Sequence, residues 1–206
     1  MAMQPYPVSF SVDYPDRPLS RLTSAFRIFT VIPIAIVLGA LGPASGGVGH
    51  HGGEFAAAGG SVVVPVVLML LFRRKYPRWW YDWNLEISRF SSRVTAYALL
   101  MDDRYPSTDD HQSVHLDYPE VTGAELNRWL PLVKWLLAIP HYILLVFLSI
   151  AAVVAVIIAW FAILFTGRYP RGLFDFVLGV LRWGNRVTAY AFVLVTDQYP
   201  PFRLSP

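Results

Sequence analysis

The chain has no cysteine and few charged residues. The cysteine count of 0 excludes disulfides, thiolate metal sites and cysteine nucleophiles. Charged residues make up 15% of the chain and the net charge is +3, whereas a typical soluble domain has roughly 25% charged residues. The basic residues are dispersed along the chain, so we expect no nucleic-acid partner. Residues 1–11 lack a basic region followed by an apolar core, so a cleaved secretory signal is not expected.

Catalytic and metal-binding motifs are also missing. No Ser/His/Asp order, phosphate-binding glycine loop or His-Glu-x-x-His pattern occurs. His50, His51 and Glu54 offer metal ligands, but neighbouring histidines in a glycine-rich loop usually point apart. His141 lies in an apolar stretch, where an ionisable group is a functional candidate, or else binds a carbonyl freed by Pro140. We therefore expect a protein that is not an enzyme, with no cofactor and no metal.

Long apolar stretches are what the chain does have. Its residues are 55% hydrophobic and 15% aromatic, with 7 Trp, which is typical of proteins that place aromatic rings at a membrane boundary. The stretch Leu130–Phe165 would be about 54 Å long as one helix, whereas a hydrocarbon core is about 30 Å thick. We predict that it reverses around Ser149–Ala152 to form a transmembrane hairpin. Leu22–Leu41 and Ala56–Phe72 are expected to form a second, looser hairpin.

An internal repeat supports this organisation. Residues 72–101 align with residues 165–194 at an offset of 93, with 13 of the 30 positions identical. The shared segments are Tyr-Pro-Arg and Arg-Val-Thr-Ala-Tyr, and a glycine-rich insertion separates the first two apolar stretches. Duplicated membrane proteins usually consist of two similar halves. We predict two repeats, residues 1–110 and 111–206.

The predicted fold is an α-helical integral membrane protein with two parallel pseudo-symmetric repeats. Each repeat begins with a short strand, because apolar and polar residues alternate in Val8–Tyr14 and Val114–Tyr118. A transmembrane hairpin follows (about 22–72 with a glycine-rich outer loop 42–60, and about 130–165), then an amphipathic cytoplasmic interfacial helix (about 79–101 and 173–195). No Lys or Arg lies within 42–60, which places this loop outside and both termini in the cytoplasm. If the last helix of each repeat instead spanned the membrane, Arg182 and Arg186 would lie at its middle.

A stripe of charged residues with the same spacing occurs in both repeats. We expect Asp82 and Asp175 to form structural pairs within the protein, for which specificity of assembly is as good a reason as stability. Arginines near anionic lipid gain about 1 kcal/mol each. The candidate contacts for lipid headgroups or a partner are Arg78, Arg89, Arg93, Arg171, Arg182 and Arg186. Arg27 and Lys134, at equivalent positions, are expected to extend to the headgroups.

The second repeat resembles the bacterial DUF4389 family. The resemblance rests on Ile139-Pro140-His141-Tyr142, on Phe165–Arg171 and on Arg186–Tyr190 with the downstream Asp197–Phe202. The first repeat is similar more loosely, since Arg73-Arg74-Lys75 replaces Thr-Gly-Arg. The resemblance implies a protein of the bacterial inner membrane in which the module is often duplicated. It implies no activity, catalytic residue or cofactor.

Two functions fit these features. The first is a non-enzymatic scaffold or accessory subunit of a membrane complex, whose partners are membrane lipids and either a second copy of itself or another protein. Bare apolar stretches and aromatic-rich interfacial helices favour it. The alternative is a small transport or lipid-handling protein with a site between the two repeats, since paired halves enclose such sites in transporters. The absence of a polar residue at mid-membrane in both halves counts against this alternative.

Overall fold

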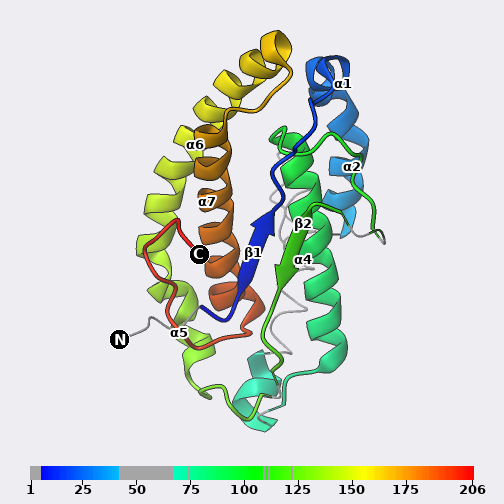
Figure 1. Ribbon diagram of the computed structural model, residues 1–206. Helices are drawn as coiled ribbons and strands as arrows, with labels where there is room; N and C mark the ends of the chain where they lie inside the picture. Colours follow the sequence, from blue (N-terminus) through cyan, green and yellow to red (C-terminus); the bar gives the residue numbers. More distant parts are fainter. Residues whose placement is uncertain (1–5, 42–66, 74, 109, 111, 122) are drawn as a thin grey trace, which may run out of the picture.

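The computed structural model describes residues 6–41, 67–73, 75–108, 110, 112–121 and 123–206. The predicted outer loop 42–60, with His50 and His51, lies outside these residues. The elements follow one another in the order of Figure 1: β1 Ser9–Val12, α1 Arg21–Ala25, α2 Arg27–Leu41, η1 Met69–Arg73, α4 Arg78–Ala98, β2 Val114–Asp117, α5 Leu130–Leu137, α6 Ile139–Thr166, α7 Arg171–Thr188 and η2 Ala189–Val193.

The two strands pair with each other in one antiparallel sheet. Phe10 lies opposite Leu116, and Val12 lies opposite Val114. These four side chains are buried, while the alternate residues of both strands are exposed. The predicted alternation is therefore confirmed, with one apolar face on the core and one polar face outward.

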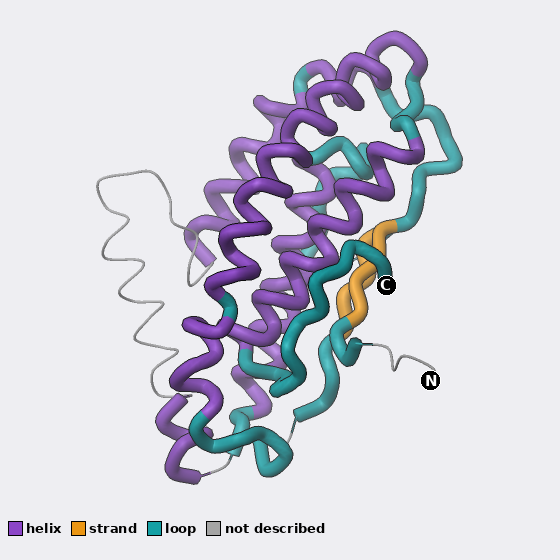
Figure 2. The backbone as a smooth tube through the Cα atoms, turned by 90° about the vertical axis from the view of Figure 1, so that its left-hand side faces the viewer, coloured by secondary structure: helices purple, strands orange, loops and turns teal. Residues whose placement is uncertain are grey.

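Each strand packs on a helix from the other half of the chain. β1 contacts α7, and β2 contacts α4. The outer helices α6 and α2 then cover α7 and α4 respectively, so that the sheet lies along one side of the helices (Figure 2). The main core contains side chains from both strands, α4, α6, α7 and η2. The boundary between repeats near residue 110 stays a prediction. Each strand, however, packs on a helix from the other side of this boundary.

The prediction of two transmembrane hairpins is wrong. α6 runs without a break from Ile139 to Thr166, so the expected reversal at Ser149–Ala152 falls in the middle of a helix. In the described part of the chain, one helical stretch, Leu130–Thr166, is long and apolar enough to cross a membrane. No glycine or proline lies between His141 and Thr166 to stop the helix. The predicted reversal assumed that the helix crosses a membrane perpendicularly. A helix that packs lengthwise on the protein can be longer than the bilayer is thick without reversing.

The prediction of parallel halves is also wrong. The indole of Trp160, late in α6, donates a hydrogen bond to the carbonyl of Ser24, which precedes α2 (3.0 Å). α2 therefore runs down the molecule while α6 runs up, and α4 and α7 are likewise opposed (Figure 1). Antiparallel pairing of β1 with β2 accounts for this, because strands related in this way impose opposite directions on the segments that follow them.

The predicted interfacial helices form at nearly the predicted positions, but they lie inside the protein. Pro77 and Pro170 are the N-cap residues of α4 and α7 and have φ of −64° and −61°, which is the value that the proline ring fixes. α4 and α7 each bury one side against the core, including Trp80, Phe90, Phe174 and Trp183. They are therefore the inner helices of the fold, between the sheet and the outer helices.

One extra residue distinguishes the end of α7 from the end of α4. Both ends reverse at a leucine in the left-handed region, Leu100 (φ 64°) and Leu194 (φ 63°). The amide of Met101 donates to the carbonyl of Ala96, whereas the amide of Val195 donates to Ala189, one residue further back. The π-helix η2 takes up this residue, as a single-residue insertion into a helix commonly does. The following Asp-x-Tyr-Pro segments therefore keep equivalent places.

Candidate functional site

Two of the repeated arginines, Arg89 and Arg182, donate hydrogen bonds to the outer edges of the sheet. Arg89 of α4 donates from Nε to the carbonyl of Leu116 (2.9 Å). Arg182 of α7 donates from Nε to the carbonyl of Phe10 (3.0 Å) and from Nη1 to that of Leu204 (3.0 Å). Phe10 and Leu116 are opposite each other in the register. Each guanidinium therefore satisfies a carbonyl that a two-stranded sheet leaves without a strand partner.

The other two stripe arginines hold the segments that follow each helix. Arg93 donates from Nη1 to the carbonyls of Ser107 and Thr108 (both 2.9 Å). Arg186 donates to the carbonyl of Arg203 (3.4 Å), and its guanidinium lies 5.7 Å from the ring centre of Tyr6. Both side chains are buried. Their main contacts are to the backbone of this chain, whereas the sequence analysis considered lipid headgroups, a protein partner or carboxylates for them.

Nearby carboxylates shift the pKa of Arg89 and the pKa of Arg182 to different extents. Burial alone would lower the pKa of Arg89, but hydrogen bonds to Asp117 (2.8 Å) and Glu86 (2.9 Å) outweigh it and raise the pKa. Burial lowers the pKa of Arg182, and the nearby charge of Asp175 partly offsets this. Arginine stays charged in either setting. Asp82 and Asp175 are exposed, and within the described ranges no hydrogen bond or ion pair joins either carboxylate.

Arg78 and Arg171 are the two candidates that remain on the surface. Both lie exposed at the first residue of their helices. The guanidinium of Arg171 lies 4.7 Å from the ring centre of Tyr14. Of the six candidate arginines, these two are the exposed ones, so an external phosphate or carboxylate could reach them.

Arg27 and Lys134 do not extend to the surface as expected. Arg27 is 3% exposed and Lys134 is 0% exposed. Arg27 donates to the carbonyl of Asp102 (2.9 Å) and stacks over Tyr97. Lys134 Nζ donates to the carbonyl of Thr196 (2.8 Å) and pairs with Asp197 Oδ1 (2.6 Å). Arg27 joins α2, and Lys134 joins α5, to the segment after the last helix of the same half, because buried charges need partners close by.

His141 lies in a closed aromatic cluster. Its ring is fully buried, and its Nδ1 accepts a hydrogen bond from Trp183 Nε1 (3.1 Å). The ring of Phe202 stacks on it at 4.0 Å, and that of Tyr199 lies 4.8 Å away. The predicted carbonyl bond is therefore replaced by an indole donor from α7. Among the described residues, no group of three His, Asp or Glu side chains could hold a metal ion.

Replacing Trp183 by Phe should destabilise the purified protein by about 1 kcal/mol, because a buried acceptor on His141 loses its donor while the aromatic packing stays. For a chain of this size the melting temperature should fall by about 2–4 °C. Thermal unfolding in mild detergent measures this. The matched control is Trp79→Phe, since Trp79 is 61% exposed, and equal shifts for the two variants would contradict the assigned role.

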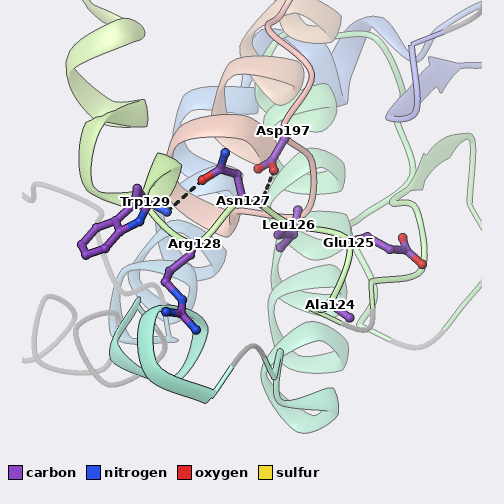
Figure 3. Close-up of a pocket in the computed structure, with 7 residues that line it drawn as sticks. All are labelled: Ala124, Glu125, Leu126, Asn127, Arg128, Trp129 and Asp197. Atoms are coloured by element: carbon purple, nitrogen blue, oxygen red, sulfur yellow. Dashed lines mark hydrogen bonds between the residues drawn. The ribbon is translucent and has the colours of Figure 1, made fainter.

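A mixed-charge pocket of about 410 Å³ lies at the start of α5 (Figure 3). Its lining is Ala124, Glu125, Leu126, Asn127, Arg128, Trp129 and Asp197. Asp197 accepts a hydrogen bond from the amide of Asn127 (2.5 Å), and the side chain of Asn127 accepts one from the amide of Trp129 (3.0 Å). The carboxylate of Asp197 is therefore already bound to Asn127 and Lys134. These contacts hold the segment before α5 against the segment that contains Asp197.

In the described part of the chain, α6 presents a long uncovered apolar surface. Only 17% of the most apolar window of Leu130–Thr166 is buried. Large exposed side chains follow one another along the helix: Ile139, Ile143, Val146, Ile150, Val153, Ile157, Phe161 and Phe165. α2 exposes Ile28, Phe29 and Ile36 in the same way. Contiguous apolar surface on this scale indicates contact with a membrane or another protein.

One comparison with known proteins matches a family model to part of the chain. Residues 129–203 match the model of a domain of unknown function, DUF4389. No curated protein and no solved structure matches the chain. The matched residues comprise α5, α6, α7, η2 and the segment that packs on His141. This match covers residues 129–203 and supports the assignment of that segment to the DUF4389 family.

Proposed function

We propose that this protein is a non-enzymatic scaffold or accessory subunit attached to the bacterial cytoplasmic membrane. The apolar surface of α6, with that of α2, contacts lipid, while the polar face of the sheet is presented to water. Both termini belong to the cytoplasmic side in this proposal. The observation that carries it is the exposure of Leu130–Thr166, because an apolar core helix of a soluble protein would be mostly buried.

The use of the polar side chains supports a scaffold. Four of the six candidate arginines bind backbone carbonyls, Lys134 is paired with Asp197, and His141 is bonded to Trp183. Side chains held in this way keep segments together and are not placed to transfer protons to a substrate. Arg78 and Arg171 remain for anionic lipid or for a protein partner, which on this proposal is a second copy or another subunit.

No observation favours the transport alternative. It requires a site between the two halves of the chain. Where the halves meet, β1 pairs directly with β2. Tyr76, just before α4, donates a hydrogen bond to the carbonyl of Val193 in η2 (2.5 Å). We therefore do not adopt it.

Glutamate on the exposed face of α6 should release the protein from membranes. Burying an isoleucine side chain contributes about 1.5–3 kcal/mol, so Ile150→Glu should weaken partition roughly tenfold or more. Flotation with phosphatidylcholine and phosphatidylglycerol vesicles measures the bound fraction. Ser11→Glu, on the exposed face of β1, is the matched control and should float like the parent. A parent protein that does not float would refute membrane attachment.

A further inference from the structure

The sheet lies level with the central part of α6, and α7 lies between the two. Near its start, His141 is bonded to Trp183, the neighbour of Arg182, which holds Phe10 of β1. Just beyond its end, the carbonyl of Tyr169 accepts a hydrogen bond from Tyr14, just after β1 (2.6 Å). β1 therefore lies level with the central part of α6, on the other side of α7 (Figure 1).

The outward face of the sheet is polar and open to solvent. Ser9, Ser11, His115 and Asp117 point to this face. His115 contacts Asp13 at 3.1 Å, with 53% and 68% of the two side chains exposed. If α6 crossed the membrane perpendicularly, these polar groups would lie level with the middle of the hydrocarbon core. No water is present there to form hydrogen bonds with them.

The length of the apolar helix is a second argument against a transmembrane orientation of α6. Leu130–Thr166 comprises 37 residues, or about 55 Å of helix, whereas about 20 residues cross a bilayer. Its exposed apolar side chains extend from Leu132 to Phe165. A membrane normal to the helix would leave many of them in water.

We propose that α6 lies in the plane of the membrane, embedded in one leaflet, with the sheet facing the cytoplasm. This rests on the membrane attachment proposed above and specifies its geometry and its partner: the boundary between headgroups and acyl chains of a leaflet with anionic lipid. In this geometry both ends of the helix lie at headgroup depth, and both carry residues suited to it. Exposed Trp129 and Trp135 lie at the α5 end, and exposed Arg21 and Arg168 lie around the other end.

Three single-cysteine variants test the orientation, and the absence of native cysteine makes each label unique. Ile139→Cys, Ile150→Cys and Phe161→Cys are eleven residues apart, so they share one face at steps of about 16 Å along the axis. All three positions are exposed. Each variant carries an environment-sensitive fluorophore and is bound to phosphatidylcholine and phosphatidylglycerol vesicles. The vesicles contain nitroxide lipids labelled either near the headgroup or near the chain end.

The expected result is the same ratio of shallow to deep quenching at all three positions. Ser11→Cys, on the sheet, should be quenched by neither lipid and should react with an impermeant maleimide added outside. Deep quenching at Ile150→Cys with shallow quenching at the two flanking positions would overturn the in-plane orientation and leave membrane attachment intact. A quenched or unreactive Ser11→Cys would overturn it as well. Failure of the unlabelled protein to float would refute the attachment itself and the orientation with it.

Discussion

Replacing Asp197 by Ala should lower the melting temperature of the purified protein by about 10 °C. Lys134 is fully buried and its ammonium lies 2.6 Å from Asp197. Removing one partner of a buried pair typically costs about 3–5 kcal/mol, because the remaining charge is left uncompensated. For a chain of this size each kcal/mol corresponds to about 2–4 °C. Thermal unfolding in mild detergent gives the value.

The double variant separates the charge effect from lost packing. Lys134→Met alone should cost less than Asp197→Ala, because Asp197 keeps 27% of its side chain exposed and still accepts from Asn127. Lys134→Met combined with Asp197→Ala should recover much of the loss, since no buried charge remains. Asp175→Ala, at an exposed carboxylate, is the control and should stay within about 0.5 kcal/mol of the parent. Additive losses in the double variant would show that the pair does not act as a charge pair.

Replacing Arg182 by Met should destabilise the protein by about 3 kcal/mol. The change leaves the carbonyls of Phe10 and Leu204 without donors, and hydrogen bonds to charged groups contribute about 1.5–3 kcal/mol each. Arg182→Lys should recover only part of this, because one ammonium does not reproduce two separated guanidinium donors. The measurement is thermal unfolding in detergent with and without phosphatidylglycerol.

The lipid dependence distinguishes the two roles considered for the arginine stripe. Because Arg182 binds backbone carbonyls, its variants should lose the same stability with and without anionic lipid. Arg171→Met is the matched control on the same helix, since Arg171 is exposed at its first residue. It should stay within about 0.5 kcal/mol of the parent and bind anionic vesicles less tightly. A rescue of Arg182→Met by anionic lipid would contradict the carbonyl role.

Local patterns in the sequence predicted local structure well. The alternation of Val8–Tyr14 and Val114–Tyr118 contains both strands, and the Tyr-Pro-Arg turns precede the two inner helices, α4 and α7. These features depend on neighbouring residues, namely side-chain alternation and the restriction that proline places on the backbone. The DUF4389 resemblance of the second half also depends on contiguous segments and is confirmed.

Partners distant in sequence could not be predicted in the same way. The spacing of Arg89 and Arg182 marked them as important, but which carbonyl each one binds depends on a strand from the other half of the chain. No pattern joined His141 to Trp183, which is 42 residues away. The signal that could have found the Lys134 pair is Asp197 in the repeated Asp-x-Tyr-Pro segment, since a buried cation requires a partner.

The sequence by itself determined which segments are helix and strand, how apolar the long helix is, and the family of residues 129–203. Only the tertiary structure decided that α6 continues without reversal, that the halves run in opposite directions, and that the repeated arginines bind the backbone. The physical reason is that the length of an apolar stretch shows how much of the helix surface avoids water. It does not show whether lipid or another part of the protein covers that surface. Pairing of β1 with β2 sets the directions, and packing of α6 along α7 lets one helix extend well beyond the thickness of a bilayer.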